Sequence, residues 1–385
     1  MDISDFFQPV PRWNREGEQK RLGDSIQIYF EDFPSLDEVQ VALFGVEEDR
    51  LKRDYIEEGS SVFPIRDAFY NLYNFDFSIE IADLGTIQAG KTYEDTIFAV
   101  RHVCEYLIKK NIIPVIIGGS QDLTVANYLA YEKLEQVVNL VTIDNQIDLG
   151  LPDEDLSNKN YLKSIILHKP NFLFNLANIG SQRPYNSDEA LSLFSKMYFD
   201  NFRLGKIFEN IKLTEPLLRN ADIVSIDLSS IRFSDSSASG SGPNGLYADH
   251  ICQICKYAGM SDKLSSFGIY EYQALADTNN MTAQLVAEMI WYFLDGVANR
   301  KQDFPVGSKE DYTKYIVSLQ TEDHDLIFYK SPKSNRWWME VPYSAGTKNK
   351  YYRNHIIPCS YEDYQEATND EIPDRWWRTY QKLAH

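Results

Sequence analysis

Side chains that bind cations or transfer protons follow three apolar runs of this 385-residue sequence. The runs end in Gly-Gly-Ser-Gln-Asp at 118–122, Asp-Asn-Gln-Ile-Asp at 144–148 and Asp-Leu-Ser at 227–229. Ligands of parallel α/β sheets bind beyond the carboxyl ends of the strands, so side chains from different strand ends meet in one crevice. Carboxylate and amide oxygens are ligands that suit Mg²⁺, Ca²⁺ and Mn²⁺. The spacing therefore predicts that three of these carboxylates and two of these amides meet in one crevice.

Positioning those side chains requires a parallel sheet, and the apolar runs have the length and composition of its buried strands. Strands are predicted at 41–45, 112–118, 137–143, 221–226 and 266–270. Helical periodicity is found between and after them, at 92–110 behind a Thr92 cap and at 282–297. Alternating strands and helices predict an α/β fold, in which a doubly wound parallel sheet has helices on both faces.

The sequence changes in character along its length, which predicts three parts. A short extension covers 1–37, the α/β domain covers 38–300, and a C-terminal extension covers 301–385. The last part is rich in aromatic residues and contains four of the six tryptophans, which are Trp337, Trp338, Trp376 and Trp377. Because exposed aromatic side chains often mark interfaces, these four predict contact with a protein partner or with another subunit. The alternative is that they pack the extension onto its own sheet domain.

Local patterns predict the structure of that C-terminal extension. Two apolar runs at 325–330 and 336–341 flank a turn-rich segment, which is typical of a β-hairpin. An amphipathic stretch at 361–383 predicts helix on either side of Pro373, where a continuous helix would be interrupted.

Charge and composition exclude several classes of partner. The formal net charge is −19, which opposes binding to nucleic acid or to anionic lipid. We find no apolar run of about 18 residues that could span a bilayer and no signal-peptide pattern, so we expect a cytoplasmic protein. Four cysteines are too few to cross-link a chain of this size, and Cys252 and Cys255 have the pattern of helix core.

With these motifs in order, the sequence resembles the ureohydrolase family of arginases, agmatinases and formimidoylglutamases over roughly 38–298. Family members read Gly-Gly-Asp-His-Ser, Asp-Ala-His-x-Asp and Ser-x-Asp-x-Asp, followed by a loop that ends in Gly-Gly-Leu. The corresponding segments here are 118–122, 144–148, 225–229 and 243–246. Segments at 59–72, 178–182 and 270–271 also resemble the family. The resemblance implies the arginase-like three-layer fold.

The resemblance also implies a two-manganese site, which this chain retains only in part. The six matching ligand positions are Gln121, Asp144, Gln146, Asp148, Asp227 and Ser229, whereas the family has four Asp and two His there. Both imidazoles are replaced by neutral amides and one carboxylate by a hydroxyl, so affinity for two ions should fall steeply. Glu271 matches the carboxylate with which the family holds its substrate. No histidine aligns at Asn160 or Tyr161, in the segment where arginases and agmatinases have a catalytic one.

Two functions remain open at this point. The first is a catalytically inactive member without a cofactor that serves as a binding or scaffold module. The second is an active hydrolase of the formimidoylglutamase or agmatinase type, in which Asp144, Asp148 and Asp227 hold one Mn²⁺, Mg²⁺ or Ca²⁺ and Glu271 and Asp148 act in catalysis. In either case three carboxylates in one crevice need a cation, a lysine or arginine, or a raised pKa.

Overall fold

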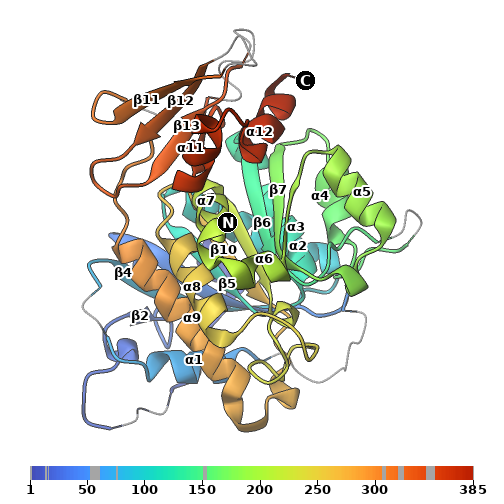
Figure 1. Cartoon of the computed structure of the whole chain (residues 1–385). Coiled ribbons are helices and arrows are strands. Elements are labelled where there is room, and N and C mark those ends of the chain that lie inside the picture. The colour runs from blue at the N-terminus through green and yellow to red at the C-terminus, as the bar shows by residue number, and fades with distance from the viewer. Residues whose placement is uncertain are drawn as a thin grey trace.

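The central feature of the molecule is one large twisted sheet (Figure 1). The computed structural model describes residues 2–13, 15, 17–52, 61–74, 77–150, 154–305, 309–319, 325–343 and 352–384. Within these residues ten strands form the sheet in the spatial order β1 (Phe7–Gln8), β4 (Glu80–Gln88), β3 (Val39–Glu47), β5 (Ile113–Ile117), β10 (Ser266–Tyr270), β9 (Ile223–Asp227), β6 (Val138–Ile143), β7 (Leu173–Ser181) and β8 (Asp200–Arg203), while β2 (Gln27–Ile28) also pairs with β4. β1 is antiparallel to β4, and the other neighbouring pairs are parallel. The predicted doubly wound parallel sheet is confirmed.

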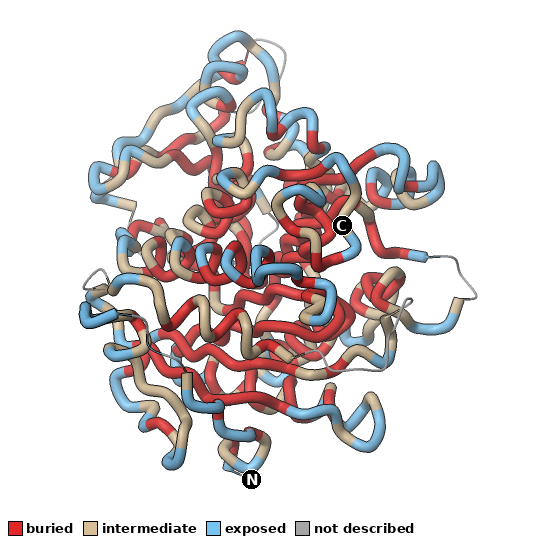
Figure 2. Tube along the Cα trace, turned by 90° about the horizontal axis from the view of Figure 1, so that it is seen from below, coloured by how far each residue is buried: buried red, intermediate tan, exposed pale blue. Residues whose placement is uncertain are grey.

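Helices cover both faces of this sheet and complete the three layers. They are α1 (Phe63–Tyr70), α2 (Tyr93–Lys109), α3 (Thr124–Ala130), α4 (Tyr161–Leu167), α5 (Asp188–Lys196), α6 (Leu204–Glu209), α7 (Glu215–Asn220), α8 (Ala248–Gly259) and α9 (Met281–Ala298). Neighbouring residues of β5 face opposite layers, since Val115 belongs to the core beneath α8 and α9 and Ile116 to the core beneath α2 and α3. Figure 2 shows the buried sheet between the partly exposed helices.

The start of α2 shows how local sequence sets an element boundary. Thr92 precedes the helix, and its side chain accepts a hydrogen bond from the backbone N of Asp95. The Asp95 side chain accepts from the backbone N of Thr92 in return, which completes a capping box. The helix predicted from 92–110 is therefore confirmed, and it begins at its predicted cap.

The C-terminal extension forms a second, smaller sheet. In the described part of this region the strands β11 (Thr313–Ser318), β12 (Asp325–Lys330), β13 (Trp337–Glu340) and β14 (Ile356–Cys359) pair antiparallel in that order. β12 and β13 form the predicted hairpin. The helices α11 (Tyr361–Thr368) and α12 (Asp374–Ala384) lie on either side of Pro373, as predicted.

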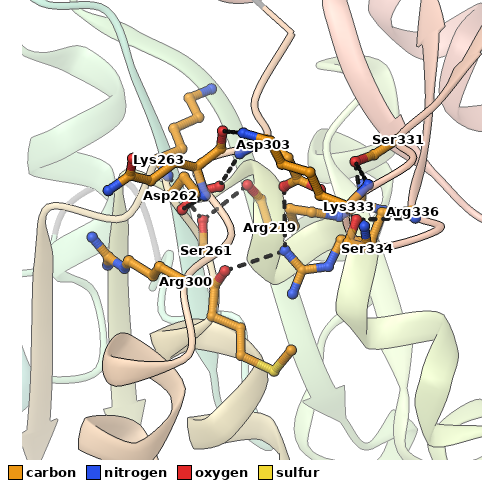
Figure 3. Close-up of polar contacts among 12 residues, drawn as sticks. Arg219, Ser261, Asp262, Lys263, Arg300, Asp303, Ser331, Lys333, Ser334 and Arg336 are labelled. Carbon is orange, nitrogen blue, oxygen red and sulfur yellow. Dashed lines mark hydrogen bonds and ion pairs between the residues drawn. The ribbon is translucent and has the colours of Figure 1, made fainter. Parts of the chain in front are cut away.

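The small sheet is attached to the large domain through α7 and the loops near it (Figure 3). Arg219 on α7 donates to the backbone oxygens of Trp337 at 2.9 Å and Cys359 at 3.0 Å. In the other direction Arg336 donates to the Met260 oxygen at 3.3 Å, and Asp303, which accepts from Ser334, donates through its backbone N to Asp262 Oδ2 at 2.9 Å. The extension therefore packs against its own chain.

This packing corrects the interface prediction for three of the four tryptophans. Trp337, Trp338 and Trp376 are at most 8% exposed, so they cannot offer a surface to a partner. Trp338 lies under the Arg219 guanidinium, 4.5 Å from its ring centroid, and Trp376 donates to the Glu340 backbone oxygen. Their large apolar area closes the core of the small sheet instead. Trp377 differs, because it is 46% exposed.

A search of the described residues found no helix with the length and apolar character needed to cross a membrane.

Candidate active site

Three carboxylates meet where β6 and β9 end. Asp144 directly follows β6, Asp227 is the last residue of β9, and Asp148 lies one short turn further on. Because Ile143 pairs with Ile226 in parallel register, the two strand ends lie side by side. One oxygen from each carboxyl lies within 4.8 Å of the others, and all three residues are buried. The predicted convergence of these carboxylates is confirmed.

Gln121 lies against two of these carboxylates. It begins a short 3-10 turn (Gln121–Leu123) after β5, and this turn depends on Gly119, which has φ of +71° and no room for a Cβ beside Leu123. The Gln121 amide finds partners at both ends when its nitrogen donates to Asp144 Oδ2 at 3.0 Å and Asp148 Oδ2 at 3.3 Å. In this orientation it is a donor to the carboxylates that the family's histidine would join in binding metal.

The other two substituted positions contribute differently. Ser229 donates through its backbone N to Asp227 Oδ1 at 2.6 Å, while its buried hydroxyl oxygen has no hydrogen-bond partner among the described residues. Gln146 is half-buried, and its backbone N donates to Asp144 Oδ1 at 2.9 Å. Both residues therefore hold a carboxylate in place through the backbone.

A lysine supplies positive charge to the cluster. Lys159 precedes α4, and its Nζ lies 3.1 Å from Asp227 Oδ2. Burial disfavours the charged ammonium, but the charges of Asp148, Asp227 and Asp144 outweigh burial and hold the pKa of Lys159 well above its usual value. This is the lysine alternative that the sequence left open for balancing the three carboxylates.

The positive charge of Lys159 does not fully compensate the carboxylates. Burial, followed by the charges of Asp148 and Asp227, raises the pKa of Asp144 well above its usual value. Burial likewise raises the pKa of Asp148 to about 6, although Lys159 opposes the shift. Asp148 Oδ1 is buried and has no hydrogen-bond partner in the part of the chain that the structure describes. An unpartnered carboxylate oxygen in such a site is suited to bind a cation.

Glu271 follows β10, the strand beside β9, and has a strained backbone conformation. Its φ is +72°, a left-handed conformation that costs a non-glycine residue about 1–3 kcal/mol. Its backbone N donates to the Gly119 oxygen at 3.0 Å, and its Oε1 accepts from the backbone N of Gln121 at 2.8 Å and from Asn158 Nδ2 at 3.1 Å. Lys52 Nζ lies 3.2 Å from Oε2.

Three residues of the site, Lys159, Asn158 and Lys52, were not found from sequence. Lys159 and Asn158 immediately precede Asn160 and Tyr161, the positions that correspond to the family's catalytic histidine, so the lysine at 159 is itself a sequence signal for a cation there. Lys52 lies in the loop after the carboxyl end of β3. A polar residue after a strand end is the same pattern that predicts the carboxylates. Periodicity could not assign it a role, because it lies in a loop.

Cys252 and Cys255 take no part in this site. Both are buried, unpaired residues of α8, as the sequence predicts. Burial raises the pKa of the Cys252 thiol to about 12, which keeps it protonated and unreactive at neutral pH.

The ligand set fits one divalent ion better than two. Asp144, Asp148 and Asp227 supply three carboxylates around one position, and hard cations accept such oxygens. A second ion would depend on Gln146 and Ser229, which bring no charge. The two-manganese centre implied by the resemblance is therefore not matched by the residues present.

Comparisons with known proteins agree with this geometry. The arginase family model matches residues 40–295, so the chain belongs to the arginase family. This confirms the resemblance that the sequence motifs indicate. Formimidoylglutamase of Staphylococcus aureus (strain MRSA252) is 24% identical over 302 residues, which cover 74% of this chain and 96% of that protein.

Solved structures show the same fold. The formimidoylglutamase of Bacillus subtilis superposes with a TM-score of 0.66 at 17% identity, covering 77% of this chain and 97% of that one. The Trypanosoma cruzi formiminoglutamase with Mn²⁺ superposes with a TM-score of 0.62 at 15% identity, covering 74% of this chain and all of that one. The arginase fold is thus established for the large domain.

Proposed function

We propose that this chain is a hydrolase of the formimidoylglutamase type, which cleaves a linear C–N bond in a formimino or guanidino compound with one divalent cation. The observation that carries the proposal is the meeting of Asp144, Asp148 and Asp227 within 4.8 Å at the strand ends of an arginase-family sheet. Formimidoylglutamases that align over most of their length support the choice of substrate class.

Each residue of the site has a distinct part in the proposed reaction. Asp144, Asp148 and Asp227 would hold a divalent cation, which would supply a Lewis acid that lowers the pKa of a bound water. Glu271 binds the cationic nitrogen group of the substrate. This group takes the position that the Lys52 ammonium occupies beside Glu271 Oε2. Asp148, which has an oxygen without a partner among the described residues, would accept the proton that the attacking water loses and pass it to the nitrogen that leaves.

The test combines metal content with product release. Inductively coupled plasma mass spectrometry after incubation with Mn²⁺ should give about one metal per chain, and a panel of formimino and guanidino compounds should yield formamide, ammonia or urea. Glu271→Gln should lower kcat/KM by about 100-fold, a loss within the range for one electrostatic contact to the reacting group. A chain that binds one metal and releases no product from any compound would contradict the proposal.

A second candidate is a catalytically inactive module that binds a protein partner or a second copy of itself. Two lysines favour it, because Lys159 pairs with Asp227 and Lys52 pairs with Glu271, two of the carboxylates that hydrolysis would use. The exposed Trp377 is the tryptophan that remains available for such a contact. Light scattering of the wild-type chain and of Trp377→Ser tests this candidate. Loss of association in the variant, without hydrolysis in either protein, would favour it over the enzyme.

A further inference from the structure

The position of Lys159 points to a role that the family pattern does not contain. Its Nζ lies 3.1 Å from Asp227 Oδ2, beside carboxylates whose oxygens approach one another within 4.8 Å. A divalent ion needs these oxygens at about 2.0–2.6 Å. We propose that Lys159 competes with a divalent cation for the carboxylates of Asp144, Asp148 and Asp227, so that this side chain sets the metal affinity of the crevice.

The turn that carries Lys159 is anchored on both sides. Asn158 is buried, donates to Glu271 Oε1 at 3.1 Å through its side chain and donates to the Leu51 oxygen at 3.2 Å through its backbone. Asn160 is also buried, and its side chain accepts from the backbone N of Ser157 at 2.8 Å. With its two neighbours fixed, the Lys159 side chain is directed to Asp227.

The Lys159 ammonium and a divalent ion repel each other, so both cannot bind Asp227 favourably at the same time. The ammonium group and a divalent ion would both contact Asp227 within a few ångströms of each other, in a buried setting where like charges repel more strongly than in water. Binding of a metal therefore requires Lys159 to leave Asp227. Its side chain is 24% exposed, so it has a path toward solvent.

The inference shares with the proposed function only the identity of the carboxylates that bind metal, and it makes no use of hydrolysis. Its experiment therefore measures Mn²⁺ affinity by isothermal titration and electron paramagnetic resonance. The variants are Lys159→Gln, which can still donate a hydrogen bond to Asp227, and Lys159→Arg, which keeps the charge. Lys52→Gln removes the ammonium on Glu271, and Lys314→Gln removes an exposed charge on β11.

We expect Lys159→Gln to bind Mn²⁺ at least tenfold more tightly than the wild type. Lys159→Arg and Lys314→Gln should stay within about threefold of the wild type, and Lys52→Gln should gain less than Lys159→Gln because its charge lies on Glu271. Equal affinity in the wild type and Lys159→Gln would overturn the inference. Equal gains in Lys52→Gln and Lys159→Gln would also overturn it, because they would indicate general electrostatics and not competition.

The metal-binding experiment can support or reject the competition whether or not the chain is a hydrolase. Tight Mn²⁺ binding by Lys159→Gln without hydrolysis by any variant would support the competition and reject the hydrolase. Should Lys159→Gln not fold, crystal structures of the wild type with and without saturating Mn²⁺ decide the matter. Lys159 displaced from Asp227 by the ion would support the inference. Mn²⁺ bound with Lys159 in place, or no ion at saturating concentration, would overturn it.

Discussion

Strand β9 has a buried carboxylate at each end, and the two differ in the cations and hydrogen-bond donors around them. Asp222, just before the strand, accepts hydrogen bonds from the backbone N and side chain of Asn139 at 2.8 and 3.2 Å. It also accepts from Gln136 and pairs with Lys263 at 3.6 Å and Arg353 at 3.3 Å. The single carboxylate of Asp222 thus has two cations and three hydrogen-bond donors, one backbone and two side-chain, beside it.

At the other end of the strand, Asp227 shares its crevice with Asp144 and Asp148, and Lys159 is the cation paired with them among the described residues. One buried oxygen of Asp148 has no partner in the part of the chain that the structure describes. The carboxylate at the amino end thus has cations and hydrogen-bond donors around it, as in a structural cluster. The carboxyl end leaves negative charge uncompensated among the described residues, which costs stability and is common where proteins bind ligands.

The largest effect should come from breaking the satisfied cluster. Asp222→Ala leaves Lys263 buried without its counter-charge and removes acceptors from Asn139. We expect a loss of about 3–5 kcal/mol in the free energy of unfolding, typical of breaking a buried pair from one side. Urea denaturation followed by circular dichroism measures it. A loss below about 1 kcal/mol would remove the contrast between the two ends.

A substitution at the unsatisfied end should have the opposite sign. Asp148→Asn removes a buried charge from the cluster, so in metal-free buffer at pH 7.5 we expect a gain of about 1–3 kcal/mol in the free energy of unfolding. The raised pKa of Asp148, about 6, means that the folded state binds more protons than the unfolded one. The contribution of Asp148 to stability is therefore lost as the pH rises from about 4 to above 6, and the gain from Asp148→Asn should be largely absent at pH 4. Destabilisation by Asp148→Asn at pH 7.5 would count against an uncompensated cluster.

Lys263 allows the amino-end cluster to be tested by pH. Burial lowers its pKa to about 8, so the unfolded state binds more protons than the folded one between pH 8 and the usual value of 10.5. The contribution of Lys263 to stability should therefore rise by on the order of 1–2 kcal/mol from pH 7 to 9.5. Comparing unfolding of the wild type and Lys263→Met at both pH values isolates this change. A constant difference between the two proteins would show that Lys263 keeps its ordinary pKa.

The smallest effect is expected from the exposed partner of Asp222. The Arg353 side chain is 38% exposed, so its ion pair is screened by solvent and salt. Arg353→Gln should cost less than about 1 kcal/mol, and 0.5 M NaCl should reduce that cost further. Differential scanning calorimetry at two salt concentrations provides the measurement. A cost close to that of Asp222→Ala would place the main counter-charge on Arg353 and not on Lys263.

The sequence was informative wherever a local pattern determines structure. Thr92 set the start of α2, and Pro373 divides α11 from α12. The polar residues at the ends of β6 and β9 gave the carboxylates of the crevice, because parallel strands bring their carboxyl ends to one edge. The role of three tryptophans was mispredicted, since an apolar ring has the same sequence signal in an interface as in a core.

By itself the sequence determined the class of fold, the family and the loss of three metal-ligand positions, since each depends on residue types in a fixed order. Only the tertiary structure decided how the remaining charge is balanced. Lys159 and Lys52 reach Asp227 and Glu271 from loops far apart in the chain, and no periodicity links them. Their roles follow from distances of about 3 Å across the crevice, which packing of the strands and loops alone sets.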